Sequence, residues 1–259
     1  MDLGLKGKVA LVSGSSRGIG RAIAAAFLAE GAEVVLTGRS QERLQEAVQQ
    51  LERLSPTAAR AHPFPGDLTD PEVRRQLFVW IEETRGRLDV LVNNLGGSAG
   101  GAIDDTSDAD WQEVFELNFW TALDLTRRAI PFFRRQGGGS IVFVTSIWGR
   151  ESGGKLAYNA AKAAEISLAK NLARELAREN IRVNAVAPGS ILFPGGSWDE
   201  RMRRDPEGIR RFVEQEIPSG RFGRPEEVAD CVVFLASERA GWVRGACLPV
   251  DGGQGRSNI

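Results

Sequence analysis

Short runs of β-branched and other apolar residues alternate along the chain with longer segments whose apolar residues recur every three or four positions. This alternation is typical of parallel β-strands joined by amphipathic helices. Runs such as 141–144 are continuously apolar, as expected of strands buried on both faces. The predicted strands are 8–13, 33–37, 59–63, 90–93, 140–145, 182–187 and 246–250. The predicted helices are 18–30, 41–54, 71–85, 108–136, 157–179 and 225–237. The pattern therefore predicts an α/β fold, with a doubly wound seven-stranded parallel sheet and helices on both faces.

One long segment interrupts the alternation. Residues 188–223 lie between the sixth predicted strand and the last predicted helix, and they are rich in Gly, Pro and Arg. Within them, residues 198–216 have the length of one or two short helices. Because loops this long in compact α/β proteins usually bind or cover a ligand, we predict a substrate loop or lid here, within a single domain of residues 1–259. The alternative is a solvated, partly ordered excursion.

The first predicted strand runs into Ser-Gly-Ser-Ser-Arg-Gly-Ile-Gly at positions 13–20, and a predicted helix follows. Glycines at this G-x-x-x-G-x-G spacing permit a tight turn and a close approach of the backbone to a pyrophosphate, and the start of a helix offers free N–H groups to the negative charge. A P-loop would require Gly-Lys followed by Ser or Thr, so a dinucleotide is favoured over a nucleoside triphosphate. The candidate cofactor contacts in this loop are Gly14, Ser16, Arg17, Gly18, Ile19 and Gly20.

The turn after the second predicted strand indicates which dinucleotide is bound. NAD-binding proteins place a carboxylate there to hold the ribose hydroxyls, whereas this chain continues with Gly38-Arg39-Ser40. Arg39 together with Arg17 has the chemistry to bind a 2′-phosphate, which favours NADP(H) over NAD(H). The alternative is that either arginine is a solvated loop charge.

Further candidate cofactor contacts follow the third and fourth predicted strands. Asp67 and Leu68 come after the third strand, and Asp67 is placed to accept a hydrogen bond from adenine. Asp70 is instead predicted to cap the next helix. After the fourth strand, Asn94 and Gly96 lie in a turn of small residues that lets the backbone pass beside the cofactor ribose.

Catalytic candidates cluster in the second half of the chain. Tyr158, the only tyrosine, stands four positions before Lys162 on a predicted helix, so the two side chains share one face. A phenol is a poor acid or base at neutral pH, but an ammonium and an oxidised nicotinamide both favour its phenolate form. Ser146 follows the fifth strand at the sheet edge where ligands bind, and its hydroxyl can polarise a carbonyl. Asn118 lies mid-helix among apolar residues, where an amide needs partners. The alternative, an incidental Tyr–Lys pair, leaves Ser146 and Asn118 unexplained.

Composition and charge exclude several other functions. Lys and Arg total 33 against 34 Asp and Glu, a formal net charge of −1, so we expect no nucleic-acid partner and no membrane partner. No apolar run approaches the roughly 18 to 20 residues that span a bilayer. The single histidine, His62, stands in a loop-like Ala-His-Pro setting, so we expect neither a hydrolase triad nor a metal site. Two cysteines and a start without a basic and apolar leader predict a cytoplasmic protein.

These motifs together resemble the classical short-chain dehydrogenase/reductase family over essentially the whole chain. The resemblance rests on Gly14, Gly18, Gly20, Asp67, Asn93, Gly96, Asn118, Ser146, Tyr158, Lys162 and Pro188-Gly189. It implies a Rossmann fold with strand order 3-2-1-4-5-6-7 and hydride transfer between a nicotinamide and a carbonyl or alcohol carbon.

The resemblance also implies the role of each catalytic candidate. Tyr158 would be the general acid/base, Ser146 would orient the substrate oxygen, and Lys162 would also hold the nicotinamide ribose. Asn118 would support a water relay. The cofactor contacts implied in the loop after the sixth strand are Pro188, Gly189 and Ile191.

Two late motifs, at 220–229 and 250–253, are similar to those of bacterial 3-oxoacyl-[acyl-carrier-protein] reductases, which are commonly homotetramers. The favoured substrate is therefore a 3-oxoacyl thioester, and a sugar, polyol or other secondary alcohol is the alternative. A non-catalytic dinucleotide-binding regulator and a Rossmann-like methyltransferase are lesser alternatives. The arginines at 127, 128, 134 and 135 are candidates for docking an acyl carrier protein, although a solvated face or a subunit contact also explains them.

Three positions depart from the family pattern. Leu95 replaces an alanine, Phe193 stands where a threonine often contacts the nicotinamide carboxamide, and Ser13 replaces a threonine. We expect cofactor binding to survive these changes, and we expect Leu95 and Phe193 to reshape the nicotinamide and substrate sites. Trp148, Trp198 and Met202 are candidate apolar walls for a substrate.

Overall fold

The computed structural model describes residues 2–55 and 57–258, and its centre is a parallel sheet in the order β3-β2-β1-β4-β5-β6-β7. This confirms the predicted doubly wound sheet and its order. The strands are β1 (Val9–Val12), β2 (Glu33–Gly38), β3 (Ala61–Pro65), β4 (Val90–Asn93), β5 (Gly139–Val144), β6 (Ile181–Pro188) and β7 (Cys247–Val250).

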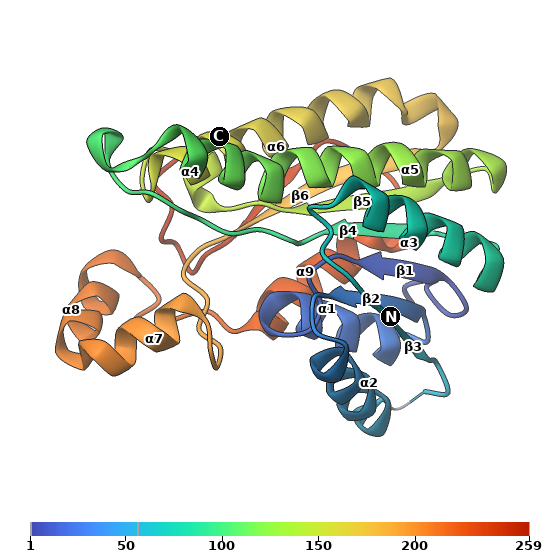
Figure 1. Ribbon diagram of the computed structural model, residues 1–259, viewed down its shortest axis with the longest axis horizontal. Coiled ribbons are helices and arrows are strands. Elements are labelled where there is room, and N and C mark those ends of the chain that lie inside the picture. Colours follow the sequence, from blue (N-terminus) through green and yellow to red (C-terminus); the bar gives the residue numbers. More distant parts are fainter. Residues whose placement is uncertain (1, 56, 259) are drawn as a thin grey trace.

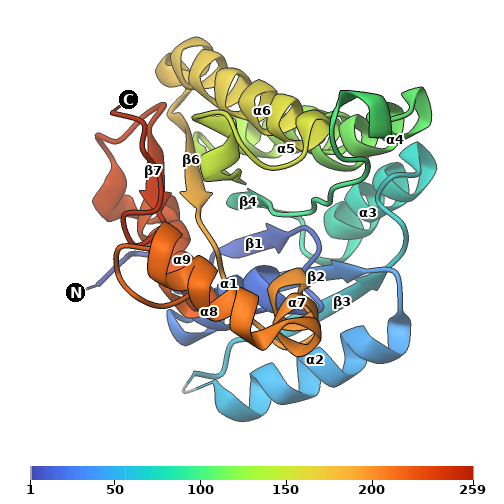
Figure 2. The same cartoon turned by 90° about the vertical axis from the view of Figure 1, so that its left-hand side faces the viewer.

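Helices cover both faces of the sheet, as Figure 2 shows. Successive residues of a strand point to opposite faces, so Ala10 joins the core beneath one helical layer and Leu11 the core beneath the other. One layer comprises α1 (Gly18–Ala29), α2 (Gln41–Leu54) and α9 (Pro225–Ala236). The other comprises α3 (Pro71–Thr84), α5 (Thr121–Arg135) and α6 (Leu156–Glu175).

Strand β3 begins two residues later than predicted and contains Pro63 and Pro65. Proline cannot donate a hydrogen bond to a neighbouring strand, but β3 pairs only with β2 and lies at an edge of the sheet. An edge position therefore tolerates a sequence that the strand pattern describes poorly.

The predicted helix 108–136 is divided into three parts. Helix α4 (Asp108–Phe115) leads into one π-helical turn, η2 (Glu116–Trp120), before α5 begins. A π-turn inserts an extra residue into the helical register and is frequent at functional sites. Asn118 lies inside this turn. The predicted helix 157–179 also ends early, because α6 stops at Glu175 and a short 3-10 turn follows.

The segment 188–223 contains two short helices, α7 (Ser197–Arg204) and α8 (Pro206–Glu216), which project from the sheet at the left of Figure 1. Its two ends are joined by a bridge between Ile191 and Gly223. The Gly223 amide donates to the Ser190 carbonyl over 3.0 Å, and the Leu192 amide donates to the Gly223 carbonyl over 2.9 Å. The segment therefore enters and leaves the sheet at one place.

The structure bears on the membrane partner and on the two cysteines considered above. In the part of the chain that the structure describes, no helix has the length and apolar character needed to cross a membrane. Cys231 and Cys247 are both free thiols.

Candidate active site

A cleft of about 1030 Å³ opens at the carboxyl ends of the strands, where the loops after β1 to β6 meet. Open parallel sheets bind ligands at this edge. The predicted site residues that line the cleft are Gly14, Ser16, Arg17, Ile19, Gly20, Arg39, Asp67, Leu68, Asn94, Gly96, Ser146, Tyr158, Lys162, Pro188, Gly189 and Ile191. Gly18 and Asn118 are not among its lining residues and lie behind it.

The glycine loop requires glycine for both conformation and space. Gly14 and Gly18 have φ angles of +64° and +57°, in the left-handed region that side chains disfavour. At Gly20, a Cβ would lie 2.5 Å from Asn94 Nδ2. That amide in turn donates to the Ser13 and Gly14 carbonyls over 2.8 and 3.1 Å. The loop is thus held rigidly against the end of β4.

The loop fits a dinucleotide pyrophosphate. Helix α1 begins directly after it, and its N-cap residue Arg17 makes no side-chain capping bond, so the first N–H groups remain available for an anion. The Arg17 guanidinium points elsewhere, because Nη1 donates to the Gly195 carbonyl over 2.7 Å. This arginine therefore links the glycine loop to the segment 188–223 as well as lining the cleft.

Arg39 and Asp67 lie together at the other end of the cofactor half of the cleft. Asp67 Oδ1 accepts hydrogen bonds from the Thr69 amide and hydroxyl over 3.0 and 2.8 Å. The Thr69 amide, and to a lesser extent the charge of Arg39, hold the pKa of Asp67 below its ordinary value. The carboxylate therefore stays ionised and able to accept a further hydrogen bond.

Ser146, Tyr158 and Lys162 converge in the middle of the cleft. Ser146 Oγ caps a 3-10 turn by accepting a bond from the Trp148 amide over 3.2 Å, which leaves the hydroxyl proton free to donate. Lys162 Nζ donates to the Val144 carbonyl over 3.1 Å and lies 5.7 Å from the centre of the Tyr158 ring. The ammonium is thus fixed beside the phenol.

Asn118 is fully buried behind this group. Its Nδ2 donates to the Val114 and Gly97 carbonyls over 2.7 and 2.8 Å, and the Gly97 amide donates to Oδ1 over 3.3 Å. A Cβ at Gly96 would lie 2.7 Å from Asn118 Oδ1 and 3.3 Å from Lys162 Nζ. The amide therefore positions the 96–97 loop against Lys162.

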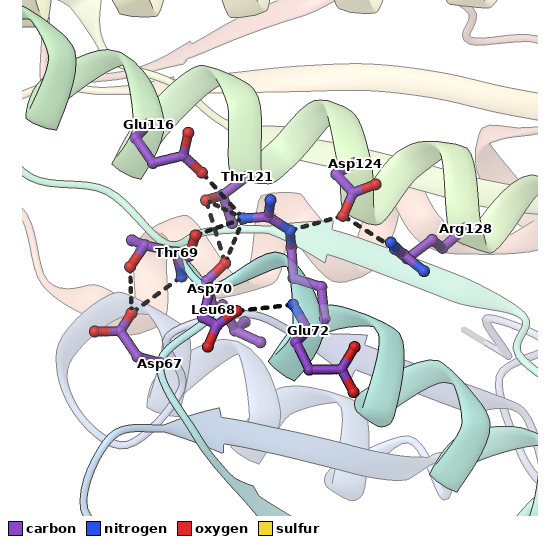
Figure 3. Close-up of polar contacts among 10 residues, drawn as sticks. Asp67, Leu68, Thr69, Asp70, Glu72, Glu116, Thr121, Asp124 and Arg128 are labelled. Atoms are coloured by element: carbon purple, nitrogen blue, oxygen red, sulfur yellow. Dashed lines mark hydrogen bonds and ion pairs between the residues drawn. The ribbon is translucent and has the colours of Figure 1, made fainter.

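A buried arginine that sequence reasoning missed, Arg74, connects the Asp67–Leu68 loop to the π-turn. Arg74 is only 5% exposed and donates to the Leu68 carbonyl and Asp124 Oδ2, both over 2.7 Å, and to Glu116 Oε1 over 3.1 Å. Figure 3 shows these acceptors arranged around the start of α3. The network ties the Asp67–Leu68 loop to the turn that carries Asn118.

Replacing Arg74 with methionine (Arg74→Met) is expected to lower the free energy of unfolding by about 3 kcal/mol, because it leaves two carboxylates and a buried carbonyl without their shared donor. Urea denaturation measures the loss. The control is Arg75→Met, since Arg75 is exposed and pairs only with Glu72 on the same helix. Equal losses in the two variants would contradict a structural role for the network.

The far end of the cleft is aromatic. Trp148 and Trp198 line it as predicted, but Met202 is not among its lining residues and Phe212 is. The Trp198 and Phe212 rings stack with their centroids 4.6 Å apart. Arg201 lies over the Trp198 ring, 4.9 Å from its centroid.

The three departures from the family pattern have visible consequences. The ring of Phe193 packs on the glycine loop, since a Cβ at Gly18 would lie 2.7 Å from it. Leu95 packs against Gly14, where a Cβ would approach it to 3.2 Å. The Ser13 hydroxyl accepts bonds from the Asn94 and Leu95 amides, each over 2.9 Å, so serine at this position joins β1 to β4.

Three of the arginines considered for carrier-protein docking bind carboxylates of their own chain. Arg128 pairs with Asp124 over 3.0 Å, and Arg135 pairs with Glu82 over 2.7 Å. Arg134 pairs with Glu179. These contacts favour the interpretation of a solvated, internally paired face.

The fold and the cleft together define a class of protein. A doubly wound sheet that places a glycine-rich loop, open to a pyrophosphate, in one cleft with Ser146, Tyr158 and Lys162 is that of an oxidoreductase that interconverts CH–OH and C=O groups with a nicotinamide cofactor.

Comparison with known proteins agrees with this class. A family model described as "Enoyl-(Acyl carrier protein) reductase" matches residues 14–254. The chain is 38% identical to the 3-oxoacyl-[acyl-carrier-protein] reductase of Thermotoga maritima, covering 96% of this chain and 98% of that protein. It is 37% identical to the 3alpha-hydroxysteroid dehydrogenase of Mediterraneibacter gnavus, covering 97% and 98%. The structure of L-sorbose reductase from Gluconobacter frateurii with NADPH and L-sorbose matches with a TM-score of 0.92 and 37% identity, covering 99% of this chain and 100% of that one.

The chain belongs to the short-chain dehydrogenase/reductase family. The similar relatives act on different substrates, so membership establishes the reaction class and leaves the substrate to be inferred from the cleft.

Proposed function

We propose that the protein is an NADP(H)-dependent reductase whose substrate carbonyl is attached to an apolar body, with a 3-oxoacyl thioester as the favoured substrate. The observation that carries this proposal is the aromatic wall formed by Trp148, Trp198 and Phe212 at the substrate end of the cleft. Aromatic walls gain free energy by excluding water from an acyl chain, whereas a polyhydroxylated substrate would need hydrogen-bonding groups along its length.

Each polar group of the site has a distinct task in this proposal. Bound NADPH supplies a hydride for the carbonyl carbon. Ser146 donates its free hydroxyl proton as a hydrogen bond to the carbonyl oxygen and so orients the substrate. Tyr158 transfers its phenol proton to that oxygen as the alcohol forms. The Lys162 ammonium stabilises the phenolate that remains, because an opposite charge nearby favours the ionised form.

The preference for NADP(H) rests on Arg39. It lines the cleft close to Asp67, and the turn after β2 offers no carboxylate that would repel a 2′-phosphate. Similarity to structures described with NADPH or NADP supports the same cofactor. The site residues named above as cofactor contacts form part of this proposal.

A second candidate is a sugar, polyol or other secondary-alcohol dehydrogenase. It is supported by the similarity to the L-sorbose reductase and by the polar residues Ser98 and Glu113, which also line the cleft. A non-catalytic regulator is disfavoured, because cofactor binding alone does not require Ser146, Tyr158 and Lys162 in one cleft.

The proposal also concerns the lid, the oligomeric state, the location and the partner of the enzyme. We infer that 188–223 is a lid over the substrate within one domain of residues 1–259, and that the enzyme is a cytoplasmic homotetramer that receives acyl groups from an acyl carrier protein. Trp242, 97% exposed, and the exposed Phe234 of α9 are apolar surface that a subunit contact would cover.

The test is the initial rate of NADPH oxidation, with NADH in parallel, against a short 3-oxoacyl thioester, simple ketones and L-sorbose. We expect saturable turnover of the thioester and a preference for NADPH. Turnover of L-sorbose alone would establish the second candidate.

A variant of Trp198 tests whether the aromatic wall causes the preference for the thioester over other carbonyl substrates. Trp198→Ala is expected to reduce kcat/KM for the thioester about tenfold by removing buried apolar contact. The rate with a short ketone that cannot reach the wall should change little. Equal losses for both substrates would contradict the role of the wall.

A further inference from the structure

Helix α6 contains a buried carboxylate that the proposed reaction does not use. Glu165 follows Lys162 by three positions and is 0% exposed. It occupies the same helical stripe as Ala157, Ala161 and Ala169, all of which are buried. An acidic residue in an alanine stripe is costly unless its charge is compensated.

Lys162 provides that compensation. Glu165 Oε2 forms an ion pair with Lys162 Nζ at 2.7 Å, and neither oxygen of Glu165 accepts a hydrogen bond within the described ranges 2–55 and 57–258. Burial raises the pKa of the Glu165 carboxyl to about 7, against the attraction of Lys162. Burial alone would lower the pKa of Lys162, but Glu165 and then Tyr158 raise it above its ordinary value. The two groups therefore titrate as one unit beside the phenol.

Several other charged groups lie on elements that pack against α6. The π-turn faces the helix with the neutral Asn118, and its Glu116 is bound to Arg74. The last residue of β5 contributes the Val144 carbonyl, and the 3-10 turn that follows begins at the neutral Ser146. On α4, the Asp110 carboxylate accepts a hydrogen bond from the amide of the N-cap residue Ser107. Arg182 of β6 donates to carbonyls at the end of α9, and Glu179 pairs with Arg134. Glu113 lines the cleft.

We propose that Glu165 is a positioning residue that acts through Lys162: it holds the ammonium beside Tyr158 and offsets part of the positive charge that the phenol experiences. The proposal rests on the function proposed above, in which Tyr158 donates a proton during carbonyl reduction. A lysine without this partner would favour the phenolate more strongly, which suits alcohol oxidation. Glu165 thus biases the site toward reduction.

The sign of the expected pH effect follows from charge. Glu165→Gln removes the negative charge while its amide oxygen can still accept a hydrogen bond from Lys162. The full ammonium charge then favours the phenolate, so that Tyr158 loses its proton at lower pH. Alcohol oxidation requires the phenolate, so its rate in Glu165→Gln should reach its maximum at a lower pH than in the wild type. Reduction requires the phenol, and its rate should begin to fall at lower pH.

The experiment measures kcat/KM against pH in both directions for the full-length wild type and for Glu165→Gln. We expect both pH limbs to move down by about one unit, within the range that a neighbouring charge produces. Glu175→Gln is the matched control, because Glu175 is an exposed residue of the same helix and the substitution is identical. Its profile should coincide with that of the wild type.

Two outcomes would overturn the proposal. Limbs that stay in place would show that Glu165 does not act on the proton transfer. pH limbs that move to higher pH would show that Glu165 serves to keep Lys162 charged.

If Glu165→Gln does not fold, Glu165→Asp is measured instead. This variant retains the charge at a greater distance from Lys162 and should shift the limbs of the pH profile down by a smaller amount. An unchanged profile in that variant would also count against the proposal. The same assay on Tyr158→Phe separates the role of Glu165 from the proposed function. If Tyr158→Phe still turned over, Tyr158 would not be the proton donor, and the proposed function itself would fail.

Discussion

Replacing Tyr158 with phenylalanine is expected to reduce kcat for carbonyl reduction about a thousandfold, the typical contribution of a positioned general acid. The substitution removes only the hydroxyl, and the ring keeps its place beside the Lys162 ammonium. Substrate and cofactor should still bind, because the glycine loop, Arg39 and the aromatic wall are untouched. Steady-state kinetics with NADPH, combined with a fluorescence titration of NADPH binding, measures both quantities.

Lysine variants provide the comparison for this result. Lys162→Met should also lose most of its turnover, since it removes the charge that stabilises the phenolate. Lys170→Met is the control, because Lys170 lies on the same helix and its Nζ contacts the Gly245 carbonyl, away from the cleft. Unchanged turnover in Tyr158→Phe would refute the assigned proton donor, and the Ser146 hydroxyl would become the remaining candidate.

Reversing the charge at Arg39 is expected to change the cofactor preference. Arg39→Glu should raise the KM for NADPH about a hundredfold, because it replaces charge-assisted hydrogen bonds, worth about 1.5 to 3 kcal/mol, with repulsion of the 2′-phosphate. The KM for NADH should stay constant or fall, since a carboxylate at this turn can accept hydrogen bonds from the ribose hydroxyls. Initial rates with both cofactors measure the ratio.

The matched control for this variant is Arg43→Glu. Arg43 is exposed on α2, one turn beyond the strand end, and it does not line the cleft. If both variants raised the KM for NADPH equally, the effect would be one of overall charge, and the 2′-phosphate would have to be bound elsewhere. Arg17, whose guanidinium contacts Gly195, would then be the next position to change.

The sequence predicted the sheet well because its signals are local. Continuous apolar runs such as Val9–Val12 mark strands that are buried on both faces, and the glycine loop follows directly from the φ angles that its turns require. The Tyr158 and Lys162 pair was found because four positions make one helical turn. In each of these cases the chemistry lies within a few residues of chain.

The parts that the sequence did not reveal depend on contacts between distant segments. The π-turn at Asn118 is stabilised by the Gly97 backbone and by Arg74 on another helix, so residues 108–136 alone are typical of one continuous helix. Glu165 was missed for a different reason, because its burial is set by the elements packed on α6. One local signal was present. On this helix an acidic residue is the third member of a stripe whose other members are buried alanines.

The bridge between Ile191 and Gly223 makes the intervening residues an exchangeable unit. Helices α7 and α8 lie between these two positions and outside the sheet, so the pairing of β6 with β5 and β7 does not depend on their length or composition. In the function proposed above this unit covers the substrate, so we expect mutations in α7 and α8 to alter substrate choice while the catalytic group and the core remain intact. Relatives named for an acyl-carrier-protein substrate, a hydroxysteroid and L-sorbose are compatible with such an arrangement. We expect that grafting the corresponding segment of a relative between the same two anchors shifts the substrate preference toward that of the relative.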